Sequence, residues 1–254
     1  MSILRKFSMV SFSLTLVLIM FFGHGMLYGG QQLPDNIVDT VLKWINRTKA
    51  QEGLEMLSID PRLNTVAKTH SSQMVKYNIL SDSNPALGTP FERIQSSGLT
   101  DINNLVVVAR AKSWDLLQEQ LESPENLSKI LSPEMTDAGI GIEQDSAGDI
   151  WLTIHMVERA ITFTQFTLSQ SNTVPARRSI IIRGNTRYKK DKVTVVPPDG
   201  SNLNLAVDRI IVPDSNGNFD IELNLGTATG NFDFKFYVQK DGVYKLKNFF
   251  SMHI

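Results

Sequence analysis

The hydrophobic positions divide the chain into two parts with different periodicities. Up to about Glu158, apolar residues recur every three or four positions in several stretches, which is the spacing of one face of an α-helix. From about Ile161 onward, short runs alternate apolar and polar residues, and turn-forming Gly, Asp and Asn residues separate the runs. The pattern therefore predicts an α+β domain followed by an all-β domain.

Signals for helix starts divide the first part into separate helices. Asp60 can accept a hydrogen bond from the first turn of a helix that opens with Pro61, whose missing N–H would have no partner at that position. Thr89 and Glu92 have the spacing of a capping box, in which each side chain binds a backbone N–H of the other residue. The other predicted helices lie within residues 34–54, within residues 113–122 and directly after Ser123.

Two alternating runs around the turn "DSAGD" predict a β-hairpin that ends the first part. Its second run, residues 150–157, places Trp151, Thr153 and His155 on one face and the even-numbered residues on the other. His70 falls on the apolar stripe of its helix, which is more typical of a packed core histidine than of a ligand. The histidine of the strand is likewise more often structural than catalytic.

The second part contains about seven short runs of strand character, of which "FDIELNL" and "NFDFKFYV" alternate most regularly. In these two runs the phenylalanines and aliphatic residues face one way and the charged residues face the other. Turn sequences such as "PPDGS" and "DSNGN" separate the runs. The pattern predicts an all-β immunoglobulin-like sandwich without the Cys and Trp landmarks of antibody domains.

The first thirty residues form a separate segment. Arg5 and Lys6 precede an apolar run from Met9 to Phe22, and small residues follow in "GHGMLYGG". A charged start, an apolar centre and a small-residue cleavage zone are the features of an export signal. An uncleaved membrane anchor is the alternative, although the run is short for a bilayer-spanning helix of about twenty residues. Both interpretations place the remainder outside the cytoplasm, secreted or associated with the cell envelope.

Composition excludes several kinds of chemistry. The 254 residues carry a formal net charge of −1, which argues against a nucleic-acid partner because such binders show a concentrated basic excess. The chain has no Cys, which excludes disulfides, thiolate metal sites, cysteine catalysis and a lipid-modified N-terminal Cys. Binding or catalysis must therefore use oxygen, nitrogen or apolar surface.

Four stretches of the first part together resemble the bacterial branch of the CAP superfamily, also called the SCP domain. In chain order they are "INRTKAQEGLEMLSIDPRLNTVAKTHSSQM", "TPFERIQSSGL", "SPENLSKILSPEMTDAGIGI" and "WLTIHMVE". The resemblance implies a three-layer α-β-α sandwich with a groove over the sheet. The expected organisation is therefore a signal peptide or N-terminal membrane anchor at residues 1–30, a CAP/SCP-like domain at 31–160, a linker or first strand at 161–177 and the β-sandwich at 178–254.

The resemblance also implies which chemistry this chain lacks. In much of the family two His and two Glu converge in the groove, a set suited to a divalent metal. The corresponding positions here are Asp82, Asn103, Asn126 and a position near Trp151. One carboxylate with two amides is a weak cation site, so we expect neither a metal nor another cofactor. The groove candidates are Asp82, Asn103, Asn126, Trp151, Thr153 and His155.

Other catalytic patterns are also missing from the sequence. It has no Gly-x-Ser-x-Gly elbow, and "SPENLSK" does not have the Ser-x-x-Lys spacing of an acyl enzyme. The glycines of "GIGIEQDSAG" lie in a strand and a turn rather than ahead of a helix, which argues against a phosphate-binding loop. Enzymatic activity thus has no support in the sequence, and a non-enzymatic protein is the favoured interpretation.

Charge differs between the two parts, because the first is acidic and the second is mildly basic. A basic run in the second part could bind an anionic envelope polymer or a lipid headgroup. One alternative is a solvated strand edge that resists edge pairing, and another is docking against the acidic first part. The contact candidates of this run are Arg183, Arg187, Lys189 and Lys190.

Three functions from different classes follow. The favoured one is an exported, non-enzymatic binding or adhesion protein, whose partner is an envelope polymer, a membrane surface or an extracellular protein. One alternative is a secreted peptidase-like hydrolase with an atypical site. The other is a carrier of a small apolar ligand such as a lipid, since some members of the family are associated with sterol or lipid binding.

Overall fold

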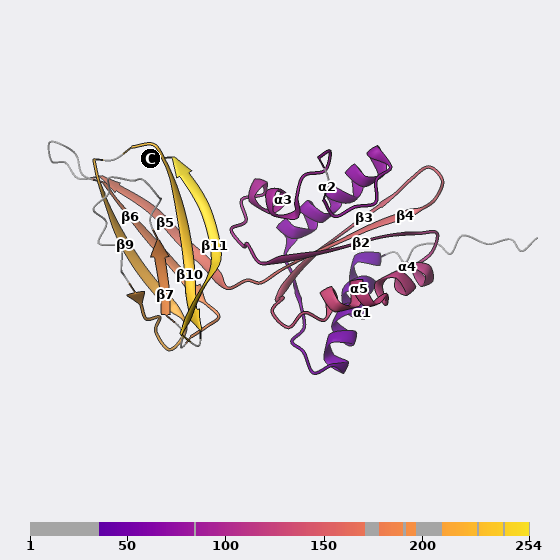
Figure 1. Ribbon diagram of the computed structural model, residues 1–254, viewed down its shortest axis with the longest axis horizontal. Helices are drawn as coiled ribbons and strands as arrows, with labels where there is room; N and C mark the ends of the chain where they lie inside the picture. Colours follow the sequence, from indigo (N-terminus) through magenta and orange to yellow (C-terminus); the bar gives the residue numbers. More distant parts are fainter. Residues whose placement is uncertain are drawn as a thin grey trace, which may run out of the picture. The chain divides into compact units, whose positions relative to one another are not determined.

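The computed structural model of the protein describes residues 36–83, 85–170, 178–189, 192–196, 210–227, 229–240 and 242–253 (Figure 1). The predicted export signal at residues 1–30, the predicted strand "NLNLAV" and Lys190 lie outside these described residues. Among the residues described, no helix has both the length and the apolar character that crossing a membrane requires. The helix-containing part, Ile37–Val157, is named the first domain, and the strands from Ile161 onward are named the second domain.

A four-stranded sheet forms the centre of the first domain. Its strands lie in the order β1 (Ser58–Ile59), β3 (Asp137–Gln144), β4 (Ile150–Val157) and β2 (Asn104–Ala111). β1 and β3 are parallel, whereas β3 and β2 both pair with β4 in the antiparallel sense. The predicted hairpin is confirmed, since β3 and β4 are its two strands.

Helices cover both faces of this sheet (Figure 1). One face carries α2 (Pro61–Tyr77) and α3 (Pro90–Ser96), and the other carries α1 (Ile37–Gln51), α4 (Trp114–Leu121) and α5 (Pro124–Ile130). The even-numbered side chains of β4 share one hydrophobic cluster with α1, α4 and α5. The first domain is therefore a three-layer α-β-α arrangement, and the two faces of β4 serve two separate cores.

Two glycines let α2 pack directly on β3. A Cβ added at Gly139 would lie 2.0 Å from the carbonyl carbon of Leu63, and one added at Gly141 would lie 2.1 Å from that of Ala67. Both neighbours are backbone atoms, so rotation of a side chain would not relieve the contact. The glycines of "GIGI" thus serve close packing, and α2 covers the odd-numbered face of β4.

The helix starts predicted at Asp60, Thr89 and Ser123 are confirmed, whereas Asn36 is the N-cap of α1. Asp60 accepts a hydrogen bond from the first turn of α2, and Ser123 does the same for α5. Thr89 and Glu92 form both hydrogen bonds of the predicted capping box at α3. These starts follow from the sequence because the capping side chain and its partner lie within three residues of each other.

The second domain contains two sheets. Strands β5 (Ile161–Gln170), β6 (Arg178–Thr186) and β9 (Asn218–Gly226) form one of them, in that order. The other has the order β11 (Val243–His253), β10 (Asn231–Lys240), β7 (Lys192–Val196) and β8 (Ile210–Ile211). The sequence allowed either a linker or a strand at residues 161–170, and the structure shows a strand there.

Both sheets of the second domain contribute to one hydrophobic core. In β9 and β10, buried and exposed side chains alternate as the sequence predicts. The buried members form a single cluster with residues of β5, β6 and β7, which places the apolar faces of the two sheets against each other. In β9 and β10 these residues are Phe219, Ile221, Leu223, Leu225, Phe232, Phe234, Phe236 and Val238.

Candidate functional site

Three of the predicted groove residues lie in different parts of the first domain. Asp82 lies in the loop after α2, where its backbone carbonyl accepts a 2.7 Å hydrogen bond from Arg93 Nη2. Asn103 precedes β2 and donates through Nδ2 to two carboxylates. Asn126 lies in α5 and donates to a backbone carbonyl of α4. Each residue is engaged with its own neighbours, and these contacts do not bring the three together.

The other three groove candidates share one face of β4, as predicted, and all are buried. Trp151, Thr153 and His155 are 1 %, 0 % and 0 % exposed. The indole N–H of Trp151 donates to Asp145 at 2.9 Å. These side chains therefore lie inside the first domain rather than in an open groove, because α2 packs closely on this face.

His155 meets His70 in the interior, a contact that the sequence did not predict. The two ring centroids lie 6.3 Å apart in an edge arrangement. His70 Nδ1 lies 3.1 Å from the hydroxyl of Thr153, and Arg93 Nε donates to His155 Nε2 at 3.4 Å. The remaining ring nitrogens, His70 Nε2 and His155 Nδ1, have no hydrogen-bond partner among the described residues. The two imidazoles and the guanidinium form a buried polar cluster between α2, α3 and β4.

Burial keeps both histidines of this cluster neutral. Together with the positive charge of Arg93, it lowers the pKa of His70 to about 4 and the pKa of His155 to about 3. Burial also lowers the pKa of Arg93 to about 10, which leaves the guanidinium charged at neutral pH. A general base is most effective when its pKa lies near the working pH, so these imidazoles are poorly suited to that role. His70 is thus a packed core residue.

Arg93 connects the cluster to the loop that carries Asp82. Its terminal nitrogens donate to the backbone carbonyls of Asp82, Leu87 and Gly88. The planar five-donor fork of an arginine allows one side chain to hold several carbonyls at once. Arg93 therefore helps to hold the loop after α2 on the domain core, next to the buried side chain of Leu87.

The positions that the resemblance assigns to the metal carry a poor set of ligands. Within the described part of the chain, no three His, Asp or Glu side chains are grouped so that they could hold an ion. Asn103 and Asn126 could offer a cation only a neutral carbonyl oxygen, and their side chains bind different neighbours, a carboxylate pair and a carbonyl of α4. These residues do not fit the divalent metal that the resemblance implies for other members of the family.

A second polar cluster joins the first domain to the second. Glu158 is fully buried, and both of its oxygens lie 2.8 Å from Lys247 Nζ. Asn103 and the hydroxyl of Tyr188 also donate to this carboxylate. Burial would raise the pKa of Glu158, but these hydrogen bonds outweigh it and the pKa is lowered. The carboxylate is therefore ionised, and its pair with Lys247 holds the end of the sheet against β11.

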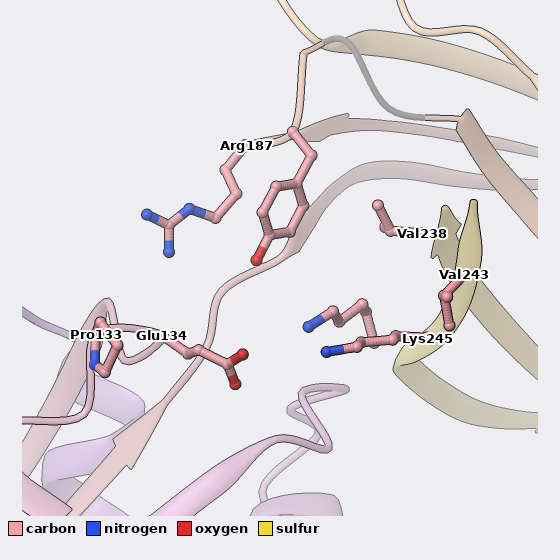
Figure 2. A pocket seen from close by; sticks show the side chains of 8 residues that line it. Pro133, Glu134, Arg187, Val238, Val243 and Lys245 are labelled. Carbon is pink, nitrogen blue, oxygen red and sulfur yellow. The ribbon is translucent and has the colours of Figure 1, made fainter. Parts of the chain in front are cut away.

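A cavity of about 550 Å³ lies beside this polar cluster (Figure 2). It is named the junction cavity. Arg187, Lys245 and Lys247 bring positive charge to it from the second domain, and Glu134 brings a carboxylate from the first. The remaining lining residues are apolar or aromatic: Pro133, Tyr188, Val238 and Val243. An apolar wall with a few charged groups is typical of small-molecule sites.

The sequence contains only part of the signal for the junction cavity. Lys245 and Lys247 stand two residues apart in β11, a spacing that predicts a shared face, although a β-bulge at Lys247 interrupts the regular alternation there. Glu134 and Arg187 are more distant in sequence and belong to loops, where no periodicity predicts which way a side chain points. The cavity therefore depends on how the two domains pack.

The basic candidates of the second domain are found in different settings. Arg187 forms an ion pair of 2.7 Å with Glu55 of the first domain, a contact of the kind that the docking alternative requires. Arg183 pairs at 2.6 Å with an aspartate of the neighbouring strand β9. Lys189 is exposed, and Lys190 lies outside the described residues. Of these four residues, Arg187 lines the junction cavity.

A comparison with known protein families agrees with the geometry of the first domain. The CAP model, described as the cysteine-rich secretory protein family, matches residues 42–157. This range runs from within α1 to the last residue of β4, so it includes the whole central sheet and the helices on both of its faces.

Similar proteins cover only part of the chain. The uncharacterized protein YkwD of Bacillus subtilis is 26 % identical over 113 residues, which is 44 % of this chain and 43 % of that protein. An extracellular SCP-domain protein of Bacillus anthracis strain Ames has a TM-score of 0.43 and 22 % identity, covering 48 % of this chain and 40 % of its own. An outer surface protein of Borrelia burgdorferi has a TM-score of 0.45 and 15 % identity, covering 48 % and 92 %. The chain thus spans less than half the length of both Bacillus proteins.

Proposed function

Since residues 42–157 form a CAP domain of the bacterial branch, we propose that the protein is an exported, non-enzymatic binding or adhesion protein that acts at the cell envelope or in the extracellular space. The location rests on the export-signal pattern of residues 1–30. In this proposal the CAP domain is a rigid frame, and the second domain adds a further contact surface.

The observation that carries the proposal is the state of the family's metal positions. By resemblance, Asp82, Asn103, Asn126 and a position near Trp151 correspond to them, and each of these four residues is engaged with a neighbour in the chain. One carboxylate, two neutral amides and a buried indole are a much weaker set of ligands for a divalent cation than two His and two Glu. A CAP domain without His and Glu at these positions is better suited to recognition than to metal-assisted chemistry.

The second domain supports an envelope role through its strand order. If β5 to β11 are given the immunoglobulin letters A, B, C, C′, E, F and G, the sheets read A-B-E and G-F-C-C′. Immunoglobulin domains place B beside E and keep C, F and G in the opposite sheet, with C′ added to that sheet in variable-type domains. We therefore assign an immunoglobulin-like sandwich, an architecture that is frequent in cell-surface proteins.

A second candidate function is the carriage of a small apolar ligand. A cavity of about 400 Å³ lies beside α3 and is lined in part by Leu99, Phe166, Phe250 and Met252. The ring of Phe166 is 40 % exposed and its centroid lies 4.8 Å from that of Phe250. Exposed aromatic side chains at a concave surface are typical of ligand sites. Mass spectrometry of the purified protein without any co-purifying lipid would eliminate this candidate.

Co-sedimentation tests the binding proposal. The full-length chain is mixed with purified cell-wall and membrane fractions, and an unrelated protein of similar size and net charge is the control. We expect the chain, but not the control, to pellet with at least one fraction. A chain that stays in the supernatant with every fraction would overturn the envelope role. Turnover on a broad panel of peptides and esters would contradict the non-enzymatic part of the proposal.

A further inference from the structure

We propose that the junction cavity binds a short peptide through its charged groups, with Arg187 and Lys245 holding a carboxylate and Glu134 holding an amine. The inference rests on the proposed binding function and names a ligand class for one site of the protein. The site is distinct from the groove that the CAP resemblance implies, because most of its lining residues belong to the second domain.

Arg187 and Lys245 provide the positive side of the site. The side chain of Arg187 is 29 % exposed, and its Nη2 pairs with Glu55, which is itself 75 % exposed. An ion pair in contact with water contributes little free energy, so a ligand carboxylate can share or replace Glu55 on the five-donor fork. Lys245 lies on β11 with its side chain exposed. Arg187, in the loop after β6, and Lys245, in β11, therefore both line the cavity.

Lys247 and Tyr188 line the cavity, but their polar groups are already bound to Glu158 and are not expected to contact the ligand. The ammonium group of Lys247 is balanced by both oxygens of Glu158, and the hydroxyl of Tyr188 donates to the same carboxylate. The pair is buried, with Lys247 8 % and Glu158 0 % exposed. A wall held by buried hydrogen bonds costs little conformational entropy when a ligand binds.

Glu134 decides the class of ligand. It is exposed, belongs to the first domain and accepts a 2.8 Å hydrogen bond from Asn103. Figure 2 shows its carboxylate directed into the cavity that also receives Lys245. A phosphate-rich polymer would bring negative charge against this carboxylate, whereas a molecule with an amine and a carboxylate complements both signs. The mixed charge therefore favours a peptide over a polyanion.

The apolar lining accommodates the rest of a peptide. Pro133, Val238 and Val243 lie beside the charged groups, together with the ring of Tyr188. The volume of about 550 Å³ lies within the range of small-molecule sites, which is about 300–1,000 Å³. A short peptide combines charged ends with apolar side chains, and the cavity offers a surface for each.

Titration calorimetry of the full-length chain with the tripeptide Ala-Leu-Ala tests the inference. We expect the peptide with free ends to bind, and its C-terminal amide to bind at least about tenfold more weakly because it loses charge-assisted hydrogen bonds. The N-acetylated peptide should bind about threefold more weakly, since it loses one exposed ion pair. No detectable heat with the free peptide at millimolar concentration, or equal affinity for the three forms, would overturn the inference.

A matched set of variants assigns the binding to the cavity. The double variant Arg187→Gln with Lys245→Ala should lose the preference for the free peptide over its amide. The control Arg183→Gln removes a paired, exposed arginine outside the cavity and should keep that preference. The inference is wrong if the double variant keeps the preference, or if inorganic polyphosphate binds more tightly than the peptide. Neither result affects the envelope proposal, because co-sedimentation of the unaltered chain decides that proposal separately.

Discussion

Acidification is expected to destabilise the first domain through the pair of His70 and His155. Both imidazoles are neutral in the folded state, with pKa values of about 4 and about 3, whereas the ordinary histidine value is 6.5. As the pH falls below 6.5, the unfolded chain therefore binds more protons than the folded chain. Stability that is fully present above this pH is lost progressively as the pH approaches the two folded pKa values.

The magnitude follows from the same values. When the pH is lowered from about 7.5 to about 4.5, each buried neutral imidazole lowers the free energy of unfolding by about 2.5 kcal/mol. The two histidines together lower it by about 5 kcal/mol. Asp101 acts in the opposite direction, because burial raises its pKa to about 6 against the opposing charge of Arg159. The folded state gains about 2 kcal/mol when this carboxylate takes up a proton over the same range. The expected net loss is therefore about 3 kcal/mol, a large fraction of the stability of an ordinary domain.

Urea unfolding followed by tryptophan fluorescence measures this loss, since all three tryptophans, at positions 44, 114 and 151, lie in the first domain. The variant His155→Gln keeps a polar side chain without a titration, and it should reduce the pH-dependent loss by about 2.5 kcal/mol. The control His253→Gln alters an exposed histidine of β11 and should leave the loss unchanged. A loss in His155→Gln as large as in the unaltered protein would refute the reasoning.

Two further predictions concern packing, and both are checked by urea unfolding. Gly139→Ala should lower the free energy of unfolding by at least about 3 kcal/mol, because its methyl group would meet the backbone of Leu63. Gly53→Ala, where the space is open but φ is +69°, should cost only about 1 kcal/mol, and equal costs for the two variants would contradict the packing argument. Lys247→Met should cost about 3 kcal/mol because it leaves Glu158 buried without its cation. Adding Glu158→Gln should recover part of that cost, and an unchanged stability of Lys247→Met would show that the pair does not hold the domains together.

Local sequence patterns predicted many elements of the fold, although they missed β1 and β2 and left residues 161–170 as either a linker or a strand. The caps at Asp60 and Thr89, the hairpin around "DSAGD" and the alternation in β9 and β10 are all present in the structure. Each depends on interactions among residues a few positions apart, or on the period of two of a strand. The same patterns placed Trp151, Thr153 and His155 on one face of β4, but they did not reveal that α2 covers this face.

The candidate site was predicted less completely than the fold. Asp82, Asn103 and Asn126 were expected in one groove by resemblance, yet each is bound to a different neighbourhood. Their residue types could be read from the sequence, whereas their partners depend on the course of the loops that carry Asp82 and Asn103 and on how α5 packs beside α4. The hydrogen-bond partners of these three residues therefore follow from the folded structure and cannot be read from the residue types alone.

The sequence by itself determined the α+β domain, most of the β-strands that follow it and the absence of cysteine chemistry. Only the tertiary structure decided that His70 lies against His155, that Glu158 pairs with Lys247, and that Glu134 faces Lys245 across a cavity. Local patterns are set by steric and hydrogen-bonding preferences within a few residues, so they can be recognised in the sequence. Buried charge pairs and cavities arise when distant segments exclude water together, and their free energies depend on distances that exist only after the chain has folded.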